Sequence, residues 1–367
     1  MNTIFQTIIL AICMASAITA FGANDYKKTI TESYDISNGA KVELINKYGN
    51  IDIRTIDSDE VNIRVEIVVD AKNEDRAQKI FDRIDIDFYH TVSSIKAETK
   101  IGDTKKRWNN IFSWKSDCNF EIHYYIEAPS HVHLKLYNKY GNIYIPDMDN
   151  DVDIVLKYGN FKMGNAHDID INLGYGNGEM ANIQNLDLDV KYSKIVVESA
   201  KDVDVKSKYS TIIIDIAKNI DADSKYDKFR IKEASNFENS GKYDDLKLGT
   251  INDIKIYSKF THIDIETLIT RAKIKTDYGS IRIDAINAEL EQIDIVSSYA
   301  SIRIYNPDKV AYRYDIETKY GSIKIDEGTG DFGDDDNEEW ARGKRKGKGS
   351  GNGLIRIESR YGNVKIR

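Results

Sequence analysis

The 367-residue chain is poor in cysteine, with two, and in proline, with three. Cys13 lies in an apolar N-terminal stretch, so a chain processed after that stretch would keep only Cys118 and no intramolecular disulfide framework. Apart from residues 4–20, no run approaches the roughly 18 apolar residues of a membrane helix. A basic excess is also missing. Lys and Arg number 52 against 60 Asp and Glu, and the net charge of −8 argues against a nucleic-acid partner.

Sequence motifs of common enzyme classes are missing as well. The chain has no G-x-S-x-G, no H-E-x-x-H, no P-loop, and no G-x-G-x-x-G before a helical pattern. His131 and His133 share one face of an expected strand and His123 is near, but no Cys or acidic residue stands at zinc-ligand spacing. We therefore predict that the protein is not an enzyme and holds no metal and no cofactor.

The first 22 residues are typical of an export signal. Residues 4–20 are nearly all apolar, the first charged side chain is Asp25, and the small residues Ala20 and Gly22 offer cleavage sites. Export would place the protein in the periplasm, or at the outer membrane or cell surface, of a Gram-negative bacterium. No Lys or Arg precedes the apolar run, which leaves a retained N-terminal anchor as an alternative.

A short motif recurs along the chain. It reads Lys-Tyr-Gly-Asn-Ile-Tyr-Ile at residues 139–145, and a close copy stands at residues 46–53. After Tyr140 its aromatic residue returns at Tyr158, Tyr175, Tyr192, Tyr209, Tyr226, Tyr243, Phe260, Tyr278, Tyr299, Tyr320 and Tyr361. Every step from Tyr158 to Phe260 is 17 residues, and a fixed period of this size indicates a repeat architecture.

Each 17-residue repeat contains two alternating apolar stretches. With the aromatic residue as position 1, positions 4 and 6 and positions 12 and 14 are mostly aliphatic, as in Ile195, Val197, Val203 and Val205. Such a unit cannot bury its own apolar face, but parallel stacking pairs every strand with its copy about 4.8 Å away. The sequence therefore predicts an all-β fold, a parallel β-solenoid of 17-residue, two-strand turns with a small α+β N-terminal cap insertion.

Strand alternation makes a prediction about the tyrosines. Positions 12, 14 and 16 and the next tyrosine are each two residues apart, so all of them should face inward. The tyrosines would then form a buried aromatic stack, and the lysines that precede them would face outward. The Gly-Asn or Gly-Ser that follows is expected to form the corner and to supply a positive φ.

The period also divides the chain into segments. After the signal peptide, 1–22, residues 23–56 hold the first repeat unit, and residues 57–130 lack the period and form the expected α+β cap, with a helix near 73–83. The solenoid repeats fill 131–326. Residues 327–353, rich in Gly and in charges of both signs, predict a flexible charged loop, and residues 354–367 predict a closing strand pair.

Two outward columns of charge are candidate interaction sites. An acidic column of Asp153, Asp170, Asp187, Asp204, Asp221 and Glu238 stands five residues before the next tyrosine, at position 13 of the 17-residue turns, and position 17 carries Lys191, Lys208, Lys225, Lys242 and Lys259. Carboxylates in adjacent turns can hold a cation such as Ca²⁺, but solvation and compensation by the lysines are the simpler interpretation. Trp340, in the expected charged loop, is a further candidate for contact with a partner.

These features together carry a family resemblance. The export-like N-terminus, the early Asn-Lys-Tyr-Gly-Asn-Ile-Asp-Ile, the α+β stretch and the Tyr-Gly-Asn and Tyr-Gly-Ser repeats resemble the "putative adhesin" β-strand-repeat family, a domain of unknown function in Bacteroidota envelope proteins. The chain is also similar to the head domains of autotransporter adhesins. The resemblance implies an exported, non-catalytic β-solenoid linked with surface attachment or envelope-stress signalling, and it implies no catalytic residues.

Three functions follow from these patterns. The favoured one is a structural or adhesin-like protein that contacts a protein or glycan component of the cell envelope or surface. The alternative is an envelope-stress or cation-sensing module. A carbohydrate-active β-helix enzyme is less favoured, because 17-residue turns leave no room for a substrate groove. The sequence ends within an expected strand, so we also predict possible self-association through the C-terminal edge of the solenoid.

Overall fold

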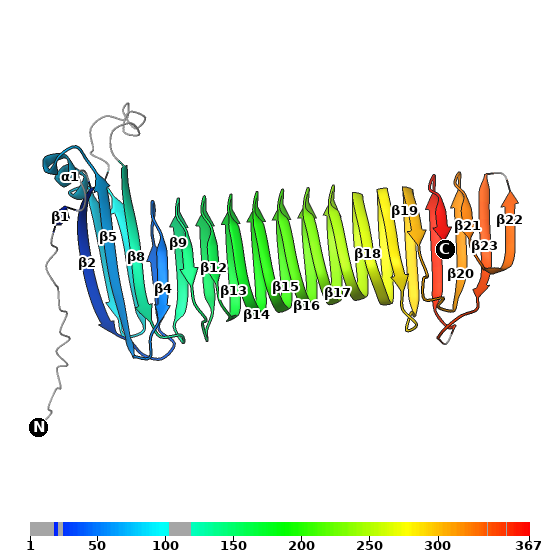
Figure 1. Ribbon diagram of the computed structural model, residues 1–367, viewed down its shortest axis with the longest axis horizontal. Helices are drawn as coiled ribbons and strands as arrows, with labels where there is room; N and C mark the ends of the chain where they lie inside the picture. Colours follow the sequence, from blue (N-terminus) through cyan, green and yellow to red (C-terminus); the bar gives the residue numbers. More distant parts are fainter. Residues whose placement is uncertain (1–17, 21–24, 103–118, 336, 350) are drawn as a thin grey trace, which may run out of the picture. The chain divides into compact units, whose positions relative to one another are not determined.

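The computed structural model describes residues 18–20, 25–102, 119–335, 337–349 and 351–367 (Figure 1). Most of the predicted signal peptide, like Cys118, lies outside the described residues. Its described part, β1 (Ile18–Ala20), pairs antiparallel with β2 (Asp25–Asp35). The chain forms two compact units, Met1–Asp170 and Ile171–Arg367, and each is described by itself.

Unit 1 contains one row of strands that changes from antiparallel to parallel. β2 pairs with β5 (Glu60–Asp70), and β5 pairs with β8 (Asn119–Ala128), both antiparallel. β8 then pairs parallel with β4 (Ile51–Thr55), β4 with β10 (Ile143–Ile145), and β10 with β12 (Phe161–Met163). The antiparallel strands thus lie at the start of a row that continues as parallel repeats.

A second row in unit 1 follows the same plan. β6 (Ile84–Thr91) pairs antiparallel with β7 (Ser94–Ile101). β7 pairs parallel with β3 (Lys41–Ile45), β3 with β9 (His133–Lys139), and β9 with β11 (Val152–Lys157). The first repeat unit therefore joins the later repeats directly in space, although residues 57–130 separate them in the chain.

Helix α1 (Glu74–Phe81) confirms the helix predicted near residues 73–83. The Asn73 side chain caps it by accepting a hydrogen bond from the Arg76 N–H at 3.1 Å, and two acidic residues occupy the first turn. Ala77, Ile80 and Phe81 are buried against β2, β5 and β6. Within the described part of the chain, no helix is long and apolar enough to cross a membrane.

Unit 2 confirms the predicted parallel β-solenoid. After β13 (Ala166–Gly174), in which the chain passes into this unit, the repeats are β14 (Asn177–Lys191), β15 (Lys194–Lys208), β16 (Thr211–Lys225) and β17 (Lys228–Lys242). Neighbouring strands pair parallel, and every pair of partners is 17 residues apart in sequence. The longer β18 (Asp245–Ile286) runs through two aromatic corners, at Phe260 and Tyr278.

The core of each turn contains the predicted apolar positions and one more. In β15, Ile195 and Val197 at positions 4 and 6 and Val203 and Val205 at positions 12 and 14 are buried, and so is Ala200 at position 9. Glu198 at position 7 and Lys201 at position 10 have no partner in the strand register, which marks two bends that flank positions 8 and 9. Each buried aliphatic side chain contributes roughly 1.5–3 kcal/mol, which offsets the ordering entropy only when summed over many turns.

The last strands of unit 2 do not follow chain order. β24 (Leu354–Arg360) lies between β19 (Gln292–Ile304) and β20 (Tyr312–Lys319), and it pairs parallel with both. β25 (Val364–Ile366) likewise lies between β19 and β21 (Ile323–Ile325), as the red strands of Figure 1 show. The predicted open edge at the closing strand pair is therefore wrong, because both strands are paired on both sides.

The predicted flexible charged loop at 327–353 is also wrong over most of its length. β22 (Thr329–Asp335) and β23 (Glu338–Arg345) form an antiparallel hairpin, and β23 pairs antiparallel with β20. The charges that suggested a solvated loop lie opposite one another: Asp331 faces Arg342 across the hairpin, and the Arg342 Nε lies 3.0 Å from a carboxylate oxygen of Asp315. Opposite charges in register stabilise strand pairing.

Candidate functional site

The repeated aromatic residues lie at corners of the chain and face solvent. From Tyr175 to Tyr361 each one has a φ between +54° and +63°, in the left-handed region. Their exposed fractions are 40–50%. The prediction of a buried tyrosine stack is therefore wrong.

The backbone at the corner explains the error. In β15 the strand ends at Lys208, at position 17, and Tyr209 takes a φ of +54°. Position 16 is buried as predicted, for example at Ser207, and position 17 is exposed. A left-handed residue is no longer extended, so the alternation that holds within the strand does not carry over to the tyrosine.

The glycine after the tyrosine has a different role from the one predicted. Positive φ belongs to the aromatic residue, and Gly279 is the only described glycine directly after one that shares it. A Cβ on Gly159 would collide with the carbonyl oxygen of Gly141, and a Cβ on Gly362 would collide with that of Ala300. Glycine is needed at these corners because adjacent turns approach closely, and the predicted positive φ is wrong there.

The exposed rings stack into an aromatic ladder. In unit 2, successive rings are 4.7–4.9 Å apart between centroids and nearly parallel, with interplanar angles of 4–12°. In unit 1, Tyr140 stacks between Tyr48 and Tyr158, at 5.3 and 5.1 Å. Each ring covers the faces of its neighbours, so the ladder presents ring edges and hydroxyl groups to solvent.

A column of lysines runs beside the aromatic ladder, as predicted from position 17. Lys191, Lys208, Lys225, Lys242 and Lys259 are exposed and pair in register from strand to strand, which sets them about 4.8 Å apart. The ammonium groups of Lys208 and Lys225 lie 5.3 Å from the ring centroids of the tyrosines that follow them. The column therefore places positive charge beside the rings of the aromatic ladder.

Most of these lysines lack a counter-charge within the part of the chain that the structure describes. Lys191 pairs with Asp189 at 3.2 Å, and Lys259 pairs with Asp277 at 3.1 Å. The three between them, Lys208, Lys225 and Lys242, form no ion pair with another described residue. Lys194 and Lys228 add positive charge on the other side of the ladder. The middle turns of unit 2 thus carry a basic strip along the corner.

The acidic column forms a separate stripe. In unit 2, Asp187, Asp204, Asp221 and Glu238 pair in register, and Lys255 follows them and forms an ion pair with Glu238. Burial, and then the Glu238 and Asp204 charges, raise the pKa of Asp221. Four residues of strand separate positions 13 and 17, about 13 Å, so the structure does not merge the acidic and lysine columns into one site.

The remaining candidate residues lie elsewhere. In unit 1, Asp153 lies 3.3 Å from the Lys135 Nζ and 3.5 Å from the His133 Nε2, and Asp170 is exposed in β13. Trp340 lies on β23, packed over Gly333, with the Arg342 guanidinium 5.5 Å from its ring centroid. Among the described residues, no three His, Cys, Asp or Glu side chains gather as metal ligands.

Position 2 carries buried polar groups that the sequence analysis missed. An oxygen of Asp227 accepts a hydrogen bond from the Ser210 N–H at 2.6 Å, and Asp244 accepts one from the Asp227 N–H at 2.8 Å. Their second oxygens accept hydrogen bonds from Ser207 and Ser224. Burial raises the pKa of both carboxyls, to about 6 for Asp244. The sequence does contain a sign of these polar groups, because position 2 changes from glycine to Ser, Ser, Asp and Asp in four successive repeats.

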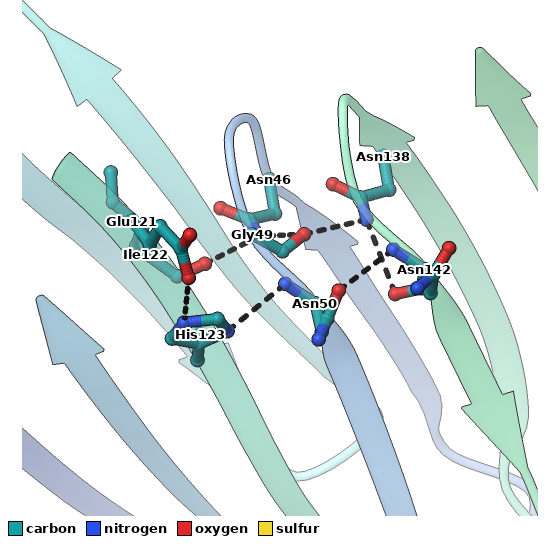
Figure 2. A network of polar contacts seen from close by, with 8 residues as sticks. All are labelled: Asn46, Gly49, Asn50, Glu121, Ile122, His123, Asn138 and Asn142. Atoms are coloured by element: carbon teal, nitrogen blue, oxygen red, sulfur yellow. Dashed lines mark hydrogen bonds and ion pairs between the residues drawn. The ribbon is translucent and has the colours of Figure 1, made fainter. Parts of the chain in front are cut away.

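Unit 1 forms its corners with asparagine (Figure 2). The Asn142 N–H donates to the Asn50 side chain at 2.9 Å, and the Asn50 N–H donates to the His123 Nδ1 at 3.2 Å. The His123 Nε2 in turn lies 2.8 Å from a Glu121 oxygen, so the neutral ring donates there. His123 thus lies at the end of a chain of hydrogen bonds that links the corners. Both of its ring nitrogens form hydrogen bonds, so neither is available to bind a metal.

These observations define a class of protein, a parallel β-solenoid with an outer aromatic ladder flanked by lysines. Residues 41–367 match the family model described as Toastrack DUF4097, and the chain belongs to this family. The resemblance to the "putative adhesin" strand-repeat proteins is thereby confirmed. The match carries no specific biochemical role.

Several solved structures are similar to the chain at low identity. A "putative cell adhesion protein" from Clostridium sporogenes is 10% identical, with 92% of this chain and 99% of that chain covered and a TM-score of 0.21. A "putative adhesin" from Bacteroides fragilis is 11% identical, with 93% and 97% covered and a TM-score of 0.22. A "putative lipid binding protein" from Parabacteroides distasonis is 10% identical, with 92% and 96% covered and a TM-score of 0.22. No functionally curated protein matches the chain.

Proposed function

We propose that the protein is an exported, non-catalytic β-solenoid that holds an anionic polymer of the cell envelope along one corner of unit 2. This aromatic–lysine corner consists of the pairs Lys191–Tyr192, Lys208–Tyr209, Lys225–Tyr226, Lys242–Tyr243 and Lys259–Phe260. The polymer is a glycan with a carboxylate or phosphate on successive units. The protein acts by attachment and supplies no reaction step.

The observation that carries the proposal is the row of unpaired charge at Lys208, Lys225 and Lys242. Three ammonium groups in register, one strand apart, repel one another unless anions lie between or above them. A linear polyanion lying along the solenoid supplies such anions at a matching repeat. A compact monovalent ligand would neutralise one lysine and leave the others unmatched.

The aromatic ladder supports the choice of polymer. Single-stranded nucleic acids bind by stacking bases on free ring faces, and here each interior face is covered by another ring. Neutral sugars that stack on ring faces are disfavoured for the same reason. Ring edges are positive and tyrosine hydroxyls donate hydrogen bonds, so the ladder and the lysines both favour an anion rich in acceptor oxygens.

Location in the envelope is part of the proposal. The apolar N-terminal stretch supports export, and the names of the structural neighbours fit a surface or envelope role. The acidic column keeps cation sensing as the second candidate, because burial and then three neighbouring carboxylates raise the pKa of Asp221, and a cation would relieve the repulsion between the carboxylates. A glycan partner remains our choice because Lys208, Lys225 and Lys242, in the middle of the corner, form no ion pair with another described residue.

Binding to polygalacturonate tests the proposal. Purified protein is titrated calorimetrically with polygalacturonate and, in parallel, with neutral dextran. We expect binding to polygalacturonate that weakens with added salt, and none to dextran. The triple variant Lys208→Gln, Lys225→Gln, Lys242→Gln should bind roughly tenfold more weakly, since three exposed ion contacts contribute about 0.2–1 kcal/mol each.

The matched control removes the same charge elsewhere in unit 2. Lys201→Gln, Lys218→Gln, Lys232→Gln changes three exposed lysines that lie away from position 17. This control should bind like the unaltered protein. Equal losses in the two triple variants would assign binding to net charge alone and would overturn the aromatic–lysine corner.

A further inference from the structure

The C-terminal segment, residues 354–366, occupies a place that chain order does not give it. β19 and β20 follow one another in the chain, yet β24 separates them and pairs parallel with each. β25 separates β19 from β21 in the same way (Figure 1). The other turns of unit 2 from β14 to β19 stack in chain order. The gap that β24 and β25 fill is called the strand-acceptor slot.

The segment fits the slot as a complete repeat. Ile355 lies in register between Ile293 and Tyr314. The Tyr361 ring stacks 4.7 Å from one neighbouring ring of the ladder and 4.8 Å from the other. The Ser359 Oγ lies 3.2 Å from the Ser297 Oγ at the buried position 16. Strand register, aromatic corner and polar corner are thus continuous across the slot.

The slot buries the apolar side chains of the segment that fills it, and this limits which sequences can occupy it. Ile355, Ile357 and Ile366 are fully buried, and Val364 is nearly so. Without an occupant, the apolar side chains of the neighbouring turns that pack against these four residues would be exposed to solvent. The N–H and C=O groups along the edges of the two bordering strands would also be exposed. The slot therefore selects a strand with apolar residues at alternate positions, a tight aromatic-glycine corner, and a second alternating strand.

The connector to the segment has the composition of a hinge. Residues 346–353 include Gly347, Gly349, Gly351 and Gly353, and the second and third of these have φ of +88° and +70°. Eight residues span up to about 28 Å when extended. Within the described part of the connector, Lys348 lies beside residues 309–311, and its N–H donates to the Lys309 carbonyl at 2.8 Å.

We infer that the strand-acceptor slot can be filled by residues 354–366 of a second copy of this chain, which gives a reciprocal strand-swapped dimer. Every contact inside the slot is the same in the swapped and unswapped forms, so only the connector and protein concentration set the balance. The glycine-rich connector permits both paths. This inference does not depend on the proposed glycan binding, which uses other turns.

A disulfide trap distinguishes the two forms. Ser297→Cys and Ser359→Cys are introduced in a background where Cys13 and Cys118 are serine. In the unswapped form the disulfide is intramolecular, and in the swapped form it joins two chains. A second pair, Ser297→Cys with Glu358→Cys, is one residue out of register and should not form. Non-reducing gels after refolding at rising protein concentration should show a growing covalent dimer band.

Shortening the connector sharpens the test. Deletion of residues 346–352 leaves one connector residue, too few to cross the two strand spacings, about 10 Å, that separate Arg345 and Leu354 on opposite sides of β20, so residues 354–366 can reach only the slot of a neighbouring chain. We expect this variant to be a dimer by light scattering, with its trap disulfide intermolecular. A monomer with an intramolecular disulfide, or a folded monomer whose segment is cut by protease, would contradict the inference.

A peptide experiment covers the case in which the trap variants fail to fold. A chain that ends at Gly353 is mixed with a synthetic peptide of residues 353–367, or with a peptide whose apolar and charged positions are exchanged. The native peptide should raise the melting temperature and bind roughly a hundredfold more tightly than the exchanged peptide. No binding to a truncated chain that still melts cooperatively would overturn the inference.

Discussion

Replacing Asp244 by Asn is expected to stabilise the protein by about 2 kcal/mol at pH 7.5 and to change little at pH 4. The Asp244 carboxyl is buried beside a second carboxyl, Asp227, and its pKa is raised from 3.8 to about 6. A rise of about two pKa units corresponds to a cost of about 3 kcal/mol for ionising this carboxyl in the folded state at pH 7.5. Asparagine avoids this cost but removes one charged hydrogen-bond acceptor, which lowers the gain in stability by about 1 kcal/mol.

The direction of the pH dependence follows from linkage. Between pH 3.8 and about 6 the folded state holds the Asp244 proton more firmly than the unfolded state, so stability falls as pH rises through this window. The raised pKa values of Asp227 and Asp221 act in the same direction. In Asp244→Asn the part of this fall due to residue 244 should disappear.

Chemical denaturation at pH 4, 5, 6 and 7.5 measures this effect. The control variant is Asp215→Asn, since Asp215 is exposed in β16, two turns before Asp244. The control should follow the pH profile of the unaltered protein. If Asp244→Asn is less stable than the unaltered protein at pH 7.5, the carboxylate stabilises the corner when charged, and our assignment of a burial cost is wrong.

Replacing Tyr209 by Ala is expected to destabilise the protein by about 3 kcal/mol. The ring stacks at 4.9 Å with Tyr192 and with Tyr226, and each such pair contributes about 0.5–1.5 kcal/mol beyond area burial. More than half of the side chain surface is also covered, because its exposed fraction is 41%. Alanine would lose both contributions and keep the left-handed backbone.

A glycine variant tests the backbone part of the argument. At φ +54° an L-residue pays a steric cost that glycine does not, so Tyr209→Gly should be about 1 kcal/mol less destabilising than Tyr209→Ala. In an ordinary strand the order is the reverse. Tyr209→Phe should be nearly neutral, since Phe260 occupies the same place and stacks at 4.8 Å with both neighbours. Urea midpoints compare the three variants.

The fold was predictable because burial repeats with the sequence period. The burial of the side chains at positions 4, 6, 12 and 14 could be predicted without knowing any long-range contact. The helix could be located from Asn73 and the two acidic residues after it. The lysine column could be placed outward because position 17 still belongs to the strand. Alternation is a local property, and it gave correct faces wherever the chain is extended.

The errors arise where local alternation stops. A tyrosine with positive φ is rare, so the corner was assigned to the glycine that follows. The buried carboxyls at Asp227 and Asp244 follow from the close stacking of corners, which no single repeat reveals. Residues 354–366 look like any other repeat, and nothing in their pattern tells which two turns they separate.

The central claim is that the aromatic–lysine corner faces solvent and holds an anionic glycan. Hydroxyl-radical footprinting with and without polygalacturonate tests both parts at once. The account predicts that Tyr192, Tyr209, Tyr226 and Tyr243 are oxidised in the free protein and protected by polygalacturonate, while Tyr257, which lies two residues before Lys259, changes less. Unreactive ladder tyrosines in the free protein, or protection confined to the acidic column, would contradict it.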